Sequence, residues 1–142
     1  MGEGERVFCP KLTLYLIENP DHPSQVETIE SFGNLISGVY RQENRNFDLI
    51  ESPTEYYILM HTSEKIEEGL RLAIPSFLPY GFDYLIFYKK QFVNNEMKLF
   101  FAPRLFKKTV TLAADSIYPK VMTNHLKWEK VLDGWIRDVC QK

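Results

Sequence analysis

Histidine is the first residue type to inspect for catalysis or metal binding, and the chain contains three: His22, His61 and His125. They fall on separate predicted elements, and none belongs to a His-x-x-x-His or Glu-x-x-His pair. A zinc site needs three or four side chains that converge on one point, and clustered spacing is what makes such a motif recognisable. The sequence therefore predicts no metal site.

His61 is the one histidine whose position suggests chemistry. It ends a predicted strand just before a predicted helix, whose first backbone amides could bind an anion. Together with Ser63, and with a lysine or aspartate that the fold brings near, it could form the site of a small enzyme. An ordinary structural role beside the helix N-cap is the preferred interpretation. A pocket that holds His61 next to a second titratable group would favour the enzyme.

The other motifs of catalysis and phosphate binding do not occur. Cys9 precedes a proline in a strand-like segment, and Cys140 lies at the far end of a predicted helix. Neither thiol therefore has the cationic or helix-N-terminal surroundings that activate a cysteine nucleophile. The sequence has no Gly-x-Ser-x-Gly, no Gly-rich loop ending in Gly-Lys-Ser/Thr and no Gly-x-Gly-x-x-Gly. We predict no catalytic residue and no cofactor.

Charge is distributed unevenly along the chain. Residues 1–80 hold 13 acidic and 6 basic residues, a net charge of −7, whereas residues 81–142 hold 6 acidic and 11 basic residues, a net charge of +5. Within residues 89–108, Glu96 is the single acid among six basic residues, and phenylalanines are interleaved with them. We take this segment as the candidate binding site, with the residues Lys89, Lys90, Lys98, Phe100, Arg104, Lys107 and Lys108.

Three interpretations of this basic segment remain open, in the following order. Lysines on an exposed strand discourage edge-to-edge pairing between sheets, which would make the segment a protected edge. Alternatively, the segment docks an acidic protein partner. In the third interpretation it binds nucleic acid, with phosphates on the lysines and bases stacked on phenylalanine. This comes last because the chain's pI is about 5.9, whereas nucleic-acid-binding domains are usually basic.

The elements that would position these residues follow from hydrophobic periodicity and turn signals. Alternation in residues 7–17 predicts a strand with one buried face, and a capping box from Ser24 to Glu27 opens a predicted helix that runs to Tyr40. Asn94 and Asn95 tolerate positive φ, so they predict a β-hairpin between a strand at residues 82–93 and one at residues 97–102. The other predicted elements are strands at residues 47–51, 55–61 and 109–113 and a helix from about residue 64 to 77, interrupted at Pro75.

The last predicted element is a helix at residues 120–140, with Val121, His125, Trp128, Leu132, Trp135 and Val139 on one stripe. We expect it to be an integral packing element, so that Trp128→Ala would leave the protein unfolded or barely folded. The element order predicts an α+β fold: a ferredoxin-like βαββαβ core extended by a β-hairpin or meander and a C-terminal helix. No linker or repeat divides the chain, so residues 1–142 are predicted to form one domain.

Composition limits the compartment and the function class. Two widely separated cysteines predict free thiols in a reducing compartment, and no segment resembles a signal peptide or a membrane span. We therefore expect a cytoplasmic protein that does not enter a membrane. The favoured function is a non-enzymatic protein-interaction module, an adaptor, inhibitor or assembly subunit that could self-associate. The alternatives are nucleic-acid binding through residues 89–108 and, third, a small enzyme with a site near His61.

Overall fold

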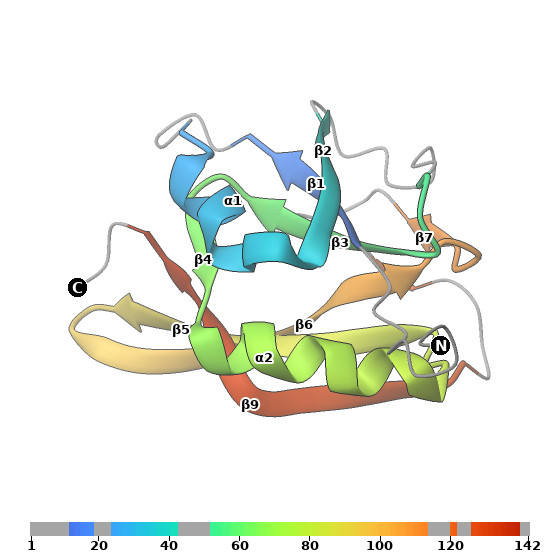
Figure 1. Cartoon of the computed structure of the whole chain (residues 1–142). Coiled ribbons are helices and arrows are strands. Elements are labelled where there is room, and N and C mark those ends of the chain that lie inside the picture. Colours follow the sequence, from blue (N-terminus) through green and yellow to red (C-terminus); the bar gives the residue numbers. More distant parts are fainter. Residues whose placement is uncertain (1–11, 19–23, 43–51, 114–119, 122–125, 140–142) are drawn as a thin grey trace, which may run out of the picture.

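The computed structural model describes residues 12–18, 24–42, 52–113, 120–121 and 126–139 (Figure 1). In these ranges two short helices accompany a large, strongly curved sheet. The elements are β1 (Leu12–Ile17), α1 (Val26–Phe32), η1 (Gly33–Leu35), β2 (Ile36–Gln42), β3 (Tyr56–His61), β4 (Glu64–Ile66), α2 (Glu68–Phe77), η3 (Leu78–Tyr80), β5 (Tyr84–Val93), β6 (Glu96–Lys107), β7 (Leu112–Ala113), β8 (Lys120–Val121) and β9 (Trp128–Asp138). Within these ranges, no helix is long and apolar enough to cross a membrane.

The predicted ferredoxin-like βαββαβ core is wrong: the protein is mostly sheet, a seven-stranded curled half-barrel. The helix predicted for residues 24–40 ends at Phe32, because Gly33 takes a positive φ of 58° and the β-forming residues that follow make β2. It also lacks the predicted capping box, since Gln25 is its N-cap and no side chain caps it. The strand predicted at residues 47–51 lies outside the described residues.

The sheet has the strand order β2-β1-β3-β6-β5-β9-β4. The pairs β1–β2, β1–β3 and β5–β9 are parallel, and the pairs β3–β6, β5–β6 and β4–β9 are antiparallel. β3 and β4 are joined by the short turn Thr62-Ser63, although β4 pairs at the far edge of the sheet. Around this turn, Thr62 donates a backbone hydrogen bond to Ile17 and Val139 donates one to Ser63. The chain thus crosses from one half of the curled sheet to the other at this point.

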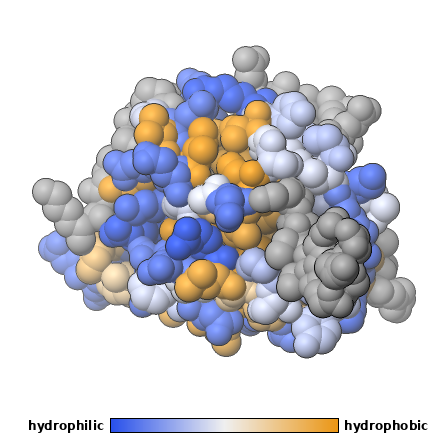
Figure 2. Space-filling view, viewed as in Figure 1, coloured by the Kyte–Doolittle hydropathy of each residue, from blue (hydrophilic) through white to orange (hydrophobic). Residues whose placement is uncertain are grey.

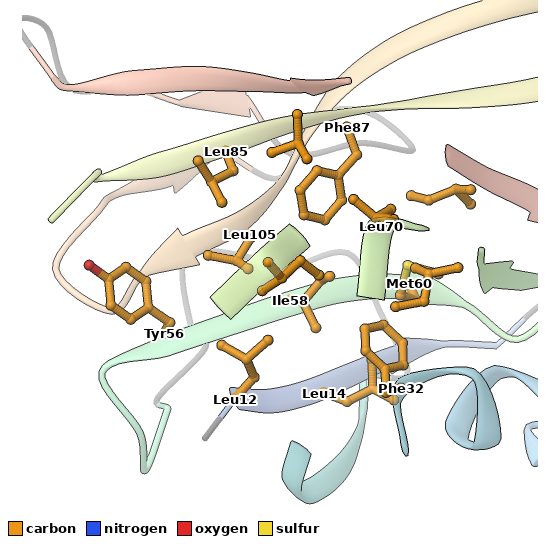
Figure 3. Close-up of a cluster of buried hydrophobic side chains, with 14 of the residues drawn as sticks. Leu12, Leu14, Phe32, Tyr56, Ile58, Met60, Leu70, Leu85, Phe87 and Leu105 are labelled. Atoms are coloured by element: carbon orange, nitrogen blue, oxygen red, sulfur yellow. The ribbon is translucent and has the colours of Figure 1, made fainter. Parts of the chain in front are cut away.

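The main core fills the inside of the curl, between the sheet and the two helices (Figure 3). Its side chains come from both halves of the sheet, for example Leu14 and Ile58 from one and Phe87 from the other, with Phe32 and Leu70 added by α1 and α2. A second buried cluster lies on the other face of β1, β3 and β6, under Val110 and Leu112. Strand β1 is therefore buried on both faces, not on one as its alternation predicted.

Two glycines allow α2 to cross β9 at backbone contact. A Cβ atom built on Gly134 would lie 2.2 Å from the backbone nitrogen of Leu70, and one built on Gly69 would lie 2.4 Å from the backbone oxygen of Asp133. Both distances are far below van der Waals contact, and the atoms met are backbone atoms that cannot rotate away. This crossing holds α2 over the end of the core.

We expect Gly134→Ala to destabilise the protein by about 2 kcal/mol or more, because the added methyl group overpacks a backbone contact. Gly38→Ala is the matched control: its Cβ would meet only the Tyr40 ring at 3.6 Å, an ordinary contact. Urea unfolding followed by circular dichroism measures both free energies of unfolding. Equal stability of the two variants would contradict the close crossing of α2 and β9.

The helix predicted for residues 120–140 is also wrong, since residues 128–138 form strand β9 between β5 and β4. Val131 and Ile136 are the buried apolar residues of this strand, whereas Leu132 is 63% exposed and Trp128 is 47% exposed. Trp128 stacks on Tyr84 with ring centroids 6.2 Å apart. The helical stripe was a coincidence of spacing, and Trp128 is not a core residue. His125, on the same predicted stripe, lies outside the described residues.

Trp128→Ala should therefore cost about 1 kcal/mol, the scale of an exposed aromatic pair, and not unfold the protein. Phe32→Ala, which empties a position with no solvent exposure, should cost about 3–5 kcal/mol. Thermal and urea unfolding of the two variants decide the point. A Trp128→Ala variant that melts as low as Phe32→Ala would restore the packing role that the sequence suggested.

Candidate functional site

The candidate site lies on the hairpin formed by β5 and β6. The structure confirms this hairpin, which the sequence predicted. Asn94 and Asn95 both have positive φ, 53° and 66°, as a two-residue type I′ turn requires. β6 pairs with β5 along most of its length. In contrast, β6 pairs with β3 only through its residues Leu105, Phe106 and Lys107. Residues 88–101, here called the distal hairpin, therefore extend past β3, as Figure 1 shows.

One face of the distal hairpin is apolar and aromatic. Side chains alternate between the faces of a strand, and residues paired across two strands share a face. The pairing register therefore puts six residues on this side, the aromatic face: Tyr88, Lys90, Phe92, Met97, Leu99 and Phe101. All but Tyr88 and Lys90 are large, exposed hydrophobic residues, and Leu99 is 52% exposed. Tyr88 packs on Phe101 and on Trp135 of the neighbouring strand β9, with ring centroids 5.7 and 6.3 Å apart.

Two lysines contribute positive charge to the aromatic face. The ammonium group of Lys90 lies 3.5 Å from the centroid of a Trp135 ring. That of Lys130, on β9, lies 4.8 Å from the ring centroid of Phe101. Such cation–π contacts are worth about 0.5–1 kcal/mol at exposed sites. They hold the lysine heads against the rings, so that the face presents cations together with apolar surface.

The opposite face of the hairpin is tied to the body of the protein by a buried ionic cluster. Glu64 is fully buried, and its carboxylate accepts two hydrogen bonds from the Arg104 guanidinium, both at 2.8 Å. The Lys89 ammonium lies 2.9 Å from the same carboxylate and 2.8 Å from Asp138. Gln91 donates a further hydrogen bond to Asp138 at 3.1 Å. The base of the distal hairpin is thus clamped to β4 and β9.

The Glu64 carboxylate is ionised in this cluster. Burial alone would raise the pKa of Glu64, but the charge and hydrogen bonds of Arg104 and the charge of Lys89 outweigh it and hold that pKa well below its usual range. The backbone N–H of His61 also donates to this carboxylate at 2.9 Å. A carboxylate whose two oxygens are occupied in this way is an anchor, unsuited to accepting a substrate proton.

The structure separates the seven residues predicted for the binding site into three groups. Lys89 and Arg104 are buried in the ionic cluster, so they do not present charge at the surface. Lys90, Lys98 and Phe100 lie on the distal hairpin, where Phe100 is 43% exposed and shares the face opposite to the aromatic face with Lys98. Lys107 and Lys108 lie at the other end of β6, about 30 Å along the strand from Lys98. These seven residues do not form one basic groove.

Sequence reasoning missed part of the aromatic face. Met97, Leu99 and Phe101 alternate with Glu96, Lys98 and Phe100, so a stricter use of the period of two could have found them. Trp135 and Lys130 carry no such signal, because the apolar spacing of their segment predicts a helix. Their place beside Tyr88 and Phe101 depends on the pairing of β9 with β5, which no local pattern encodes.

The enzyme hypothesis gains no site in the described part of the chain. After His61 come the turn Thr62-Ser63 and strand β4, and the helix begins only at Glu68, so His61 does not stand before a helix N-terminus. A hollow of about 430 Å³ between α1, β4 and α2 is not lined by His61 or Ser63. Its rim is hydrophilic (Figure 2) and carries the ion pairs Lys65–Glu27, Arg71–Glu68 and Arg137–Glu67. Among the described residues no three His, Cys, Asp or Glu side chains could hold a metal; His22, Cys9 and Cys140 lie outside them.

Comparison with known proteins adds no family to this geometry. No protein-family model matches the chain, and no curated protein matches it.

Glu64→Gln should destabilise the protein by about 3–5 kcal/mol, since it leaves the buried Arg104 without its counter-charge and Lys89 with Asp138 alone. Glu68→Gln is the matched control, because Glu68 is exposed and its pair with Arg71 at 3.5 Å is a surface pair worth less than about 1 kcal/mol. Urea unfolding at neutral pH measures both changes. A Glu64→Gln variant as stable as Glu68→Gln would contradict the anchoring role of the cluster.

The destabilisation caused by Glu64→Gln should depend on pH. The folded pKa of Glu64 lies below its ordinary value of 4.5, so its stabilising contribution is complete above pH 4.5 and is lost as the pH falls toward the folded pKa. The difference in unfolding free energy between the parent and Glu64→Gln should therefore shrink by up to about 1.4 kcal/mol per pH unit below 4.5. If this difference stayed constant from pH 6 to about pH 3, the lowered pKa assigned to Glu64 in the folded protein would be wrong.

Proposed function

We propose that the protein is a non-enzymatic protein-interaction module, an adaptor, inhibitor or assembly subunit, that binds its partner through the distal hairpin. The observation that carries this proposal is the aromatic face, where Phe92, Met97, Leu99 and Phe101 are exposed side by side. Contiguous exposed apolar surface on a protein is typical of interaction sites. Aromatic anchors such as those beside Trp135 also supply much of the binding energy at interfaces.

The hairpin's attachment supports the same proposal. Lys89 and Gln91 fix the base of the distal hairpin through Glu64 and Asp138. A surface that is held in its binding conformation before the partner arrives loses less conformational entropy on binding. The buried cluster therefore supports binding indirectly, although two of its members, Lys89 and Arg104, are not themselves contact residues.

Charge favours an acidic partner. On the aromatic face and its border, Lys90 and Lys130 contact the aromatic rings as cations, and Lys98 is exposed on the other face. Oppositely charged surfaces accelerate encounter and select the partner. We place this interaction in the cytoplasm, in keeping with the two distant cysteines of the sequence.

Nucleic-acid binding remains the second candidate, because cations over exposed aromatic rings also suit a single strand with stacked bases. Against it, Lys89 and Arg104 are buried and paired with Glu64 and Asp138, which leaves fewer cations to contact phosphates. Fluorescence anisotropy with single-stranded RNA and DNA at low salt separates the two candidates. Binding that weakens steeply as salt rises would support this second candidate over the first.

The direct test is site-specific photo-crosslinking in the native source, with a photoreactive phenylalanine analogue at position 99 or at position 72. Leu99 and Leu72 are both exposed, at 52% and 66%, but Leu72 lies on α2. We expect one discrete protein adduct from position 99 and none from position 72. Adding Phe101→Asp should remove the adduct, because a carboxylate disrupts the apolar contact. The same adducts from both positions, or none from position 99, would contradict the proposal.

A further inference from the structure

We infer that the open edge of β6, at residues 97–101, takes up an extended acidic and apolar segment of a partner protein as an added antiparallel strand. This inference rests on the proposed function, since it names the partner class for the same hairpin. Addition of a strand to a sheet edge is a common way for a protein to bind a peptide, because the backbone gives affinity and the side chains give specificity.

The first observation is the unpaired edge itself. Within the described residues, the neighbours of β6 are β5 and β3, and the ladder with β3 begins only at Leu105. Val93 and Glu96 flank the two-residue turn, and in such a hairpin this closing pair is hydrogen-bonded. Every second residue of β6 then directs its N–H and C=O toward β5. The residues between them, Met97, Leu99 and Phe101, direct theirs toward the open edge.

The second observation is that this edge lacks the usual protection. Natural edge strands are kept short or carry several charges, prolines or bulges. β6 is 12 residues long, and Lys98 is the only charged residue between positions 97 and 102. Pro103 and the irregular register at Leu85 come where β6 approaches β3, beyond the open stretch. The edge is thus available over residues 97–101 and ends at Pro103, which has no N–H to donate.

The side chains along the edge define the chemistry of the segment. The residues with outward backbone groups, Met97, Leu99 and Phe101, all point to the aromatic face. Residues of an added antiparallel strand that pair with them share that face and should be apolar. The alternate residues lie on the side of Lys98 and Phe100, where an acidic side chain gains a counter-charge. The expected pattern alternates apolar and acidic residues.

A second copy of this chain fits the edge less well than an acidic partner. Two β6 edges paired antiparallel about Leu99 would place Lys98 of each copy opposite Phe100 of the other and diagonal to the other Lys98, so that neither lysine gains an acidic counter-charge. Self-association through opposite charge is not favoured either, because the acidic half of one copy and the basic half of another do not form separate lobes that could bind each other. β4, from the acidic half, pairs with β9 from the basic half.

The test uses synthetic peptides as probes: a short peptide of alternating valine and aspartate, and its valine–lysine counterpart. Fluorescence anisotropy measures the binding of each to the full chain. We expect the valine–aspartate peptide to bind at least about tenfold tighter. Leu99→Asp should weaken this binding by about tenfold or more, whereas Leu72→Asp on α2 should leave it unchanged.

Backbone N-methylation distinguishes an added strand from simple contact with the aromatic face. In an antiparallel pair the valines opposite Met97, Leu99 and Phe101 exchange hydrogen bonds with them, whereas the aspartate N–H groups point away. N-methylation of the valines should therefore weaken binding by about tenfold or more, and N-methylation of the aspartates should not. Slowed amide hydrogen exchange at Met97, Leu99 and Phe101 should accompany binding of the unmethylated peptide.

Each other outcome overturns the inference. Equal effects of the two methylation patterns would mean that no strand is added, and failure of the peptide to bind would exclude this partner class. Concentration-dependent dimers in sedimentation velocity that Leu99→Asp abolishes would make a second copy the occupant. In the first two cases a protein adduct at position 99 would still support the proposed function, so the two failures are distinguishable.

Discussion

The geometry of the protein depends on one buried carboxylate. Glu64 stands just after the turn at which the chain leaves β3, and its two oxygens bind Arg104 from β6 and Lys89 from β5. Three segments far apart in the sequence therefore meet at one ionised group. Because an unpaired charge in this position would be costly, the three segments can take few other arrangements. The interior is specified here by charge as well as by apolar packing.

The cluster also relates the two faces of the hairpin. Two neighbouring residues on β5 point to opposite faces of the strand: Lys89 binds the buried Glu64, while Lys90 lies over the ring of Trp135 on the aromatic face. The alternation of a strand thus converts one dibasic pair into an anchor and a surface cation. On β6, Arg104 is a second anchor: its guanidinium binds Glu64, and it directly follows Pro103, where the open edge ends. Structural and binding roles are divided residue by residue.

The sequence allowed the local features to be predicted and not the long-range ones. Asn94 and Asn95, between alternating strands, encode the hairpin in a few residues. The apolar spacing of residues 128–139 fits a helix equally well, and only the neighbours β5 and β4 decide that Val131 and Ile136 are buried in a strand. The local pattern places Glu64 in the first turn of a helix. Its role as a buried anchor depends on Arg104, which lies 40 positions away and leaves no local signal. The exposed face that contains Leu99 follows from the alternation of residues 96–101, but its contact with Trp135 depends on the pairing of β5 with β9.

The position of β9 has a consequence for how the protein is made. During synthesis β4 and α2 leave the ribosome long before β9, yet β4 pairs with β9 in the sheet, and Gly69 of α2 lies against Asp133 of β9. Until residues 128–138 emerge, the apolar side chains that cover the core from α2 have no finished sheet to cover. Between the emergence of α2 and that of β9 the nascent chain therefore carries a partly open core, a state prone to aggregation and to chaperone capture. Insertion of β9 between β5 and β4 is then the step that closes the structure.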